Sequence, residues 1–130
     1  MMQTSLALSC GADHASCGLD QVGNPELDQY FTPWWAPGAL WERYFNDVPR
    51  GANVADPGCG RGAFLDAVPK EMPNVVGVEI APDVAAFAAE TTGRDVLVGD
   101  FATIALPFRP DVLFGNPPFS REKAEAFVAR

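Results

Sequence analysis

VADPGCGRG, residues 54–62, is the stretch of the sequence that decides the fold. Its apolar start predicts a short buried strand, and the glycines at positions 58, 60 and 62 predict a tight turn from that strand into a helix. Glycines let the backbone approach a ligand closely, so such a loop suits a nucleotide-like cofactor. Similar turns also serve nicotinamide and flavin cofactors or have no ligand at all, so the loop alone does not define the ligand.

The rest of the chain alternates short apolar runs with helical stretches, which is typical of a parallel α/β sheet. The pattern predicts strands near residues 53–56, 74–80, 95–98 and 111–114, and helices near 62–68, 83–91 and 121–130. We expect helices on both faces of the sheet. Right-handed crossovers would place the first strand centrally, the next two on one side of it and the fourth on the other.

Two regions precede this pattern. Residues 1–27 mix Ser, Gly, Asp and Cys without a sustained period and are predicted to be a poorly ordered leader, so we expect one domain over residues 28–130. Thr32 and Pro33 predict a helix cap and first turn, with a restart or kink at Pro37 and Gly38. An apolar stripe at helical spacing should then pack on the sheet: Leu40, Trp41, Tyr44, Phe45 and Val48.

Composition limits the class of protein. With 130 residues and 48% apolar content, the chain can bury one core, and it contains neither a membrane-spanning run nor a secretory signal, so a cytoplasmic protein is expected. Cys10, Cys17 and Cys59 are odd in number and scattered, which favours reduced thiols. Cys10, His14 and Cys17 lack a fourth ligand, so no metal site is expected.

The formal net charge of −8 argues against this segment alone holding a nucleic acid duplex through its phosphates. Three basic residues gather at the end of the chain, Arg121, Lys123 and Arg130, but a solvated helix face explains them best. Any basic binding surface should therefore lie on a further region or on a partner chain.

Polar residues follow the second and third predicted strands, at the edge where ligands bind in open parallel sheets. Glu79 comes about twenty residues after the glycine loop, where a carboxylate can accept hydrogen bonds from two ribose hydroxyls. Asp100 and Phe101 follow the third strand. An acid that accepts from an adenine amino group, beside an aromatic ring that covers the base, would suit an adenosine group.

The tetrapeptide Asn116-Pro117-Pro118-Phe119 follows the fourth strand and is the most informative motif. Its two prolines stiffen the loop and remove two donors, so the loop presents acceptors. A planar amine such as adenine N6 is a poor nucleophile because its lone pair is delocalised into the ring. If the Asn116 side-chain oxygen and the Pro117 carbonyl each accept one of its hydrogens, the lone pair is freed for an incoming methyl group.

Together these motifs resemble the class I S-adenosylmethionine-dependent methyltransferases, and the tetrapeptide resembles their adenine-N6 DNA branch. The resemblance spans residues 28–119 and implies a Rossmann-like fold, of which only the first four strands are present, truncated after the catalytic motif. It implies S-adenosyl-L-methionine as cofactor and DNA as partner, with the base flipped out of the duplex. By the resemblance, Thr32 contacts the methionine end, Asp56, Gly58 and Gly60 surround its amino group, Glu79 binds the ribose, Asp100 and Phe101 bind the adenine, and Asn116, Pro117 and Phe119 hold the target base.

Arg61 departs from the resemblance, because the family often has a small residue or threonine there. Three other readings stay open. The same chemistry could methylate an RNA base or a protein glutamine amide. The chain could instead be a non-catalytic fragment or one half of a split methyltransferase. A nicotinamide-dependent dehydrogenase would share the loop and Glu79 but would not explain Asn116-Pro117-Pro118-Phe119.

Overall fold

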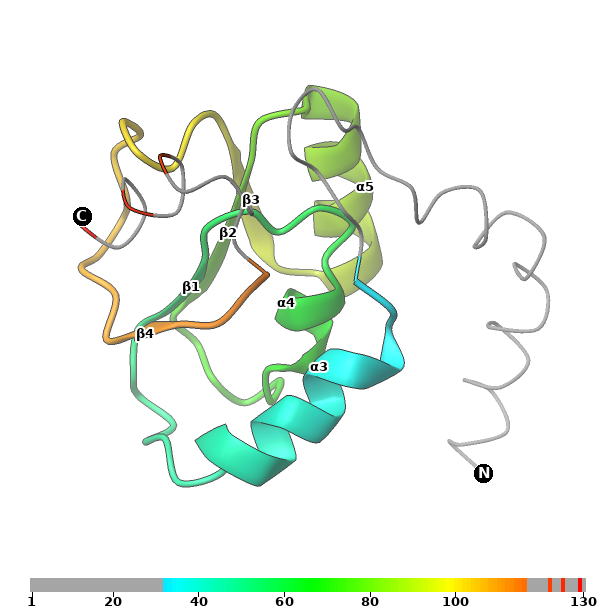
Figure 1. Cartoon of the computed structure of the whole chain (residues 1–130), viewed down its shortest axis with the longest axis vertical. Coiled ribbons are helices and arrows are strands. Elements are labelled where there is room, and N and C mark those ends of the chain that lie inside the picture. Colours follow the sequence, from blue (N-terminus) through cyan, green and yellow to red (C-terminus); the bar gives the residue numbers. More distant parts are fainter. Residues whose placement is uncertain (1–31, 117–121, 123–124, 126–128, 130) are drawn as a thin grey trace, which may run out of the picture. The chain divides into compact units, whose positions relative to one another are not determined.

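The computed structural model describes residues 32–116 and the single positions 122, 125 and 129 (Figure 1). The predicted leader at 1–27, and the helix expected at 121–130 apart from those single positions, lie outside the described residues. Within the part that is described, no helix has the length and apolar character that crossing a membrane requires.

Within residues 32–116, four parallel strands form one sheet in the order β3-β2-β1-β4, which confirms the predicted topology. Their bounds are Val54–Asp56 for β1, Val75–Glu79 for β2, Asp95–Val98 for β3 and Val112–Leu113 for β4. The central pair is fully buried, which explains its continuous apolar sequence. Because the strands are parallel, their carboxyl ends share one edge of the sheet.

Helices pack on one face of this sheet (Figure 1). They are α3 (Trp35–Leu40), the π-helix η2 (Trp41–Phe45), α4 (Ala63–Ala67) and α5 (Pro82–Thr92). The core on this face includes Trp41, Phe64, Leu65, Met72, Ala88 and Phe114. On the other face, Ala55, Val76, Val78 and Phe101 pack with Ile104, Leu106 and Phe108. In the described part of the chain, the segment after β3 thus covers the second face, and the α/β class is confirmed.

The start of the first helix differs from the prediction. Thr32 does not cap it, because α3 begins at Trp35 with Trp34 at the N-cap and no side-chain cap bond. Pro37 does not break the helix either. It occupies the first turn, where a backbone N–H has no partner within the helix.

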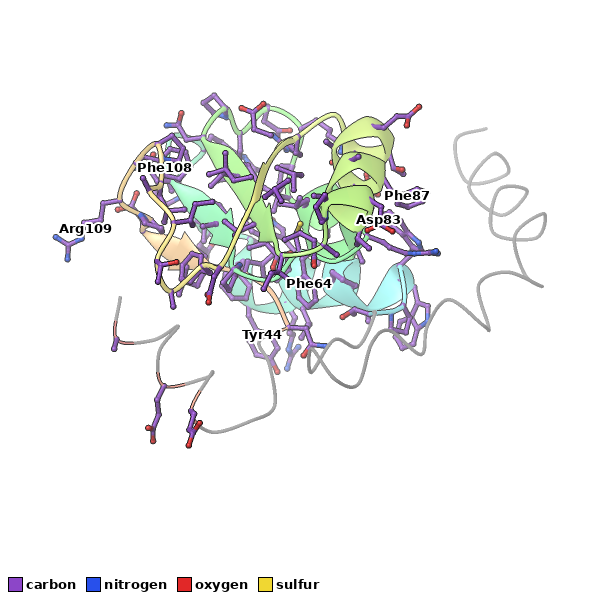
Figure 2. All side chains as sticks on the ribbon, turned by 90° about the horizontal axis from the view of Figure 1, so that it is seen from above. Tyr44, Phe64, Asp83, Phe87, Phe108 and Arg109 are labelled. Carbon is purple, nitrogen blue, oxygen red and sulfur yellow. The ribbon has the colours of Figure 1, made fainter. Side chains whose placement is uncertain are left out.

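The apolar stripe is only partly buried. Trp41 is buried, and Phe45 and Val48 pack against the core, but Leu40 and Tyr44 are 41% and 71% exposed. A π-helix has more residues per turn than the α-helix assumed in the prediction, so residues spaced for an α-helix do not all share one face. In Figure 2, the Tyr44 side chain points away from the rest of the molecule.

Candidate active site at the carboxyl edge of the sheet

The glycine loop after β1 is tied to the end of β2 by two backbone donors. The Cys59 N–H donates to the Val78 carbonyl at 2.9 Å, and the Gly60 N–H donates to Oε2 of Glu79 at 2.9 Å. Gly60 has φ 53°, a left-handed conformation that glycine adopts without strain. Hydrogen bonds to the end of β2 and the left-handed Gly60 therefore hold the loop in its conformation.

Glu79 is nearly fully buried, with 4% of its surface exposed, and both carboxylate oxygens accept backbone hydrogen bonds. Oε2 accepts from Gly60, and Oε1 accepts from Ala81 at 3.1 Å. Each carboxylate oxygen can accept more than one bond, so bracing the loop does not exclude binding of ribose hydroxyls. The ribose contact remains a prediction.

The last glycine of the loop brings two helices together. Gly62 has φ 95° and begins α4, and a Cβ atom at this position would lie 2.7 Å from Cγ2 of Thr92 on α5. Any side chain would push the helices apart.

Arg61, which departs from the family resemblance, has its guanidinium carbon 5.1 Å from the centroid of the Phe87 ring. Phe87 lies on α5 (Figure 2), so part of the Arg61 side chain packs on the flank of this helix.

Asp56 ends β1 and is 1% exposed. Its Oδ1 accepts a hydrogen bond from the Gly58 N–H at 3.3 Å, while Oδ2 is buried without a hydrogen-bond partner among the described residues. Burial raises the pKa of this carboxyl to about 8; the Gly58 N–H opposes the rise and the charge of Glu79 adds to it. A cationic or hydrogen-donating ligand at this edge would satisfy the buried oxygen, which fits the amino group of S-adenosylmethionine.

Aromatic packing holds Phe114, the residue directly after β4. The Phe114 ring centroid lies 5.1 Å from that of Trp41, 5.0 Å from that of Phe45 and 4.8 Å from that of Phe64. The next residue, Gly115, lies so close to Asp56 that a Cβ atom there would overlap its carboxylate and contact Pro57. The backbone leading to Asn116 is thus fixed by aromatic packing and by a close approach to the end of β1.

Among the residues that the structure describes, the first and last predicted site residues, Thr32 and Asn116, lie together. The Asn116 side-chain nitrogen Nδ2 donates to the Thr32 hydroxyl oxygen at 3.3 Å, although 84 positions separate the two residues in the sequence. Thr32 therefore lies at the same sheet edge as the loop after β4. Pro117 and Phe119, the other residues expected to hold the target base, lie outside the described residues.

Directly after β3, the Gly99 N–H donates to the backbone carbonyl of Glu79 at 3.0 Å. Asp100 is exposed, and its Oδ1 accepts a hydrogen bond from the Ala102 N–H in its own turn at 2.9 Å. The Phe101 side chain is 3% exposed and belongs to the core on the second face of the sheet. The sequence did not indicate this burial, because an aromatic residue after a strand end suits a core and a ligand pocket equally well. Contact of Asp100 and Phe101 with adenine remains a prediction.

Sequence reasoning missed Phe114 and Gly115 as residues that shape the site. The available signal was their position, since an aromatic residue and a glycine directly precede the asparagine motif. Among the residues that the structure describes, no group of three or more His, Cys, Asp or Glu could hold a metal ion. Cys10, His14 and Cys17, at which no metal site was expected, lie outside them.

Solved structures with the same arrangement of strands define the fold class. A putative RNA methyltransferase of Pyrococcus horikoshii matches 82% of this chain and 59% of its own at 25% identity, with a TM-score of 0.63. CalS10, an amino pentose methyltransferase from Micromonospora echinaspora solved with S-adenosylmethionine bound, matches 62% of this chain and 35% of its own at 32% identity, with a TM-score of 0.50. The chain thus carries the first four strands of the Rossmann-like fold of S-adenosylmethionine-dependent methyltransferases.

Sequence comparisons agree with this class. Residues 55–114 match the model of the family described as a methyltransferase domain. The type II methyltransferase M.CvrRI of Paramecium bursaria Chlorella virus XZ-6E is 32% identical over 92 residues, which is 69% of this chain and 24% of that protein. The chain therefore spans about a quarter of the length of this curated relative.

Proposed function

We propose that this chain is the cofactor-binding and catalytic part of an S-adenosylmethionine-dependent methyltransferase that acts on the exocyclic N6 of adenine in DNA. The observation that carries the proposal is the hydrogen bond between Thr32 and Asn116, because it unites the two motifs expected for cofactor and target. The similarity to a type II methyltransferase supports a nucleic acid target, and the methyltransferase-domain match supports the reaction.

Residues of this chain would hold the cofactor along the carboxyl edge of the sheet. The buried Oδ2 of Asp56 would accept a hydrogen from the cofactor's amino group, which favours the charged form of Asp56. Glu79 would bind the ribose and Asp100 the adenine, while Gly58 and Gly60 leave room for the ligand beside the backbone. Bound S-adenosylmethionine supplies a methyl group on a positively charged sulfur.

Asn116 would act on the target. Its Oδ1 would accept a hydrogen from the planar amine, with a second acceptor from the Pro117 carbonyl, so the nitrogen lone pair is directed out of the ring system. Alignment and charge placement then account for catalysis, and no side chain has to remove a proton before transfer. The Phe119 ring would cover the flipped base.

Replacement of Asn116 by alanine tests the proposal. In the full-length protein, we expect Asn116→Ala to lower methyl transfer to adenine in DNA at least 100-fold while affinity for S-adenosylhomocysteine changes less than about threefold, since one catalytic acceptor typically contributes this much. Label transferred from methyl-tritiated S-adenosylmethionine to DNA measures the rate. The exposed Asn46, at the end of η2, provides the matched control Asn46→Ala, which should behave as wild type.

The same assay separates the alternatives. RNA and protein pools run beside DNA, because one structural relative is named a putative RNA methyltransferase and the chain has a net charge of −8. Label in RNA or in glutamine of a protein would replace the DNA assignment and keep the chemistry. Unchanged DNA methylation by Asn116→Ala would exclude the assigned role of Asn116.

A further inference from the structure

The hydrogen bond from Asn116 to Thr32 has a defined direction. An asparagine amide ends in a donor, Nδ2, and an acceptor, Oδ1, which point to opposite sides. Because Nδ2 is directed at the Thr32 hydroxyl, Oδ1 faces away from Thr32. This is the orientation that an acceptor for a target amine requires. Rotation of the amide by half a turn would present two donor hydrogens to that amine instead.

Both partners of this bond are fixed on rigid parts of the molecule. Asn116 follows Phe114, which packs against Trp41 and Phe45 of η2, while Gly115 lies against Asp56. Thr32 precedes the helical segment α3–η2 that supplies Trp41 and Phe45. The same aromatic packing therefore holds the loop after β4 beside the segment that carries Thr32.

The hydroxyl of Thr32 can either donate to Oδ1 or accept from Nδ2, so by itself it tolerates both orientations of the Asn116 amide. A carboxylate ligand removes this freedom, because ionised carboxylates only accept hydrogen bonds. Once the hydroxyl hydrogen is given to a carboxylate, only the oxygen lone pairs remain for Asn116. The amide must then present Nδ2 to Thr32 and Oδ1 to the target.

We propose that Thr32 is a positioning residue that couples the two halves of the site: by donating to the cofactor's carboxylate, its hydroxyl fixes Asn116 with Oδ1 toward the target amine. This inference rests on the proposed function, which assigns the carboxylate to Thr32 and the amine to Asn116. Its consequence is a shift in population, since bound cofactor removes the second orientation of the Asn116 amide and leaves the one that is observed.

Substitutions of Thr32 in the full-length protein test the coupling. Thr32→Val keeps the shape and removes the hydroxyl, whereas Thr32→Ser keeps the hydroxyl. At saturating S-adenosylmethionine, we expect kcat to fall at least 10-fold in Thr32→Val and by less than about threefold in Thr32→Ser. Thr91→Val, at an exposed threonine of α5, is the control for the change itself and should match the wild type. If saturating cofactor restores the full kcat of Thr32→Val, then Thr32 only binds cofactor and the inference is wrong.

A second measurement does not depend on turnover. Exchange of the Asn116 side-chain NH₂ with solvent is followed by ¹⁵N nuclear magnetic resonance, with Asn116→Ala assigning the signal. S-adenosylhomocysteine, which retains the carboxylate, should slow this exchange at least threefold in the wild type and in Thr32→Ser, and leave it unchanged in Thr32→Val. Equal slowing in Thr32→Val would overturn the coupling. Should Thr32→Val fail to fold, Thr32→Ala replaces it in both measurements.

The two proposals fail in different ways. If the wild type methylates no adenine in DNA but the exchange pattern follows the hydroxyl, the substrate assignment is wrong and the coupling stands. If the wild type methylates DNA but neither kcat nor exchange depends on the Thr32 hydroxyl, only the coupling is wrong.

Discussion

Burying the ionised form of Asp56 is electrostatically unfavourable, and either a proton or a hydrogen-donating ligand removes this cost. The Asp56 carboxyl is buried at the end of β1, one oxygen has no partner within the described residues, and Glu79 lies near enough to disfavour a second negative charge. The pKa of about 8 means that the folded chain holds a proton here at neutral pH. A carboxyl with a pKa raised by burial, at the carboxyl edge of a parallel sheet, is a candidate functional residue.

This raised pKa predicts a pH dependence of stability. Between pH about 4 and about 8 the unfolded chain has lost the Asp56 proton and the folded chain retains it, so the free energy of unfolding falls as pH rises, by at most about 1.4 kcal/mol per pH unit. The contribution is complete below pH 4 and is lost by pH 8. Asp56→Asn should remove this part of the slope.

Urea denaturation of wild type and Asp56→Asn at pH 5, 6, 7 and 8 measures the difference. The gap between the two proteins should change steadily in favour of the variant as pH rises. Asp47→Asn, which alters an exposed carboxylate before the sheet, is the control and should keep the wild-type slope. Parallel pH profiles for Asp56→Asn and wild type would show that Asp56 is already ionised in the folded chain.

Arg94 joins secondary-structure elements rather than serving the site. It follows α5, which ends at Gly93 in a left-handed conformation, and its guanidinium donates to three carbonyls of the α4–β2 connection. Nη1 bonds Met72 at 2.7 Å, and Nη2 bonds Pro69 at 2.8 Å and Val68 at 3.2 Å. One side chain thus bonds the C-cap carbonyl of α4, at Val68, and two carbonyls of the connection that follows it.

We expect Arg94→Ala to lower the free energy of unfolding by about 2 to 3 kcal/mol, because three hydrogen bonds to partly buried carbonyls are lost. Arg94→Lys should recover less than half of this loss, since an ammonium cannot reach three acceptors in a plane. Arg109→Ala is the matched control; Figure 2 shows Arg109 pointing outward, and its loss should cost less than about 0.5 kcal/mol. Denaturation by urea measures all three, and equal losses for Arg94→Ala and Arg109→Ala would contradict the bracing role.

The bounds of strands and helices could be predicted where they depend on residues that are close together in the sequence. The strand ends at Asp56 and Val98 and the glycine turn into α4 follow from short apolar runs and glycines, and they were predicted within one or two residues. The helix after Thr32 could not be placed so well. Its threonine bonds Asn116 instead of capping the helix, and no pattern near Thr32 encodes a contact 84 residues away.

At the scale of the molecule, the order of the strands was easier to predict than which side chains face the candidate site. Right-handed crossovers left one order for the strands, and the structure has it. Whether a strand-end side chain faces the ligand or the core depends on packing from both faces, as the buried Phe101 shows. The sequence therefore predicted that the candidate residues lie at one edge of the sheet, and the structure was needed to show which of their side chains meet there.

The charge of the whole chain leads to a last prediction. Binding a duplex depends largely on Lys and Arg that displace counterions from phosphates, and a net charge of −8 opposes this. The residues proposed to bind the cofactor, by contrast, lie at the ends of β1, β2 and β3 and at Thr32, all within residues 32–116. We therefore expect the 130-residue chain to bind S-adenosylhomocysteine but not a mixed-sequence DNA duplex at about 0.15 M salt.

Calorimetric titration of the same protein sample with each ligand measures both affinities, and cofactor binding serves as the control for folding. Duplex binding through phosphate contacts would show itself as an affinity that falls steeply as salt rises. Salt-sensitive duplex binding by residues 1–130 alone would instead place a basic surface on this chain despite its charge. The few basic residues near position 121 and beyond would then be the first to replace.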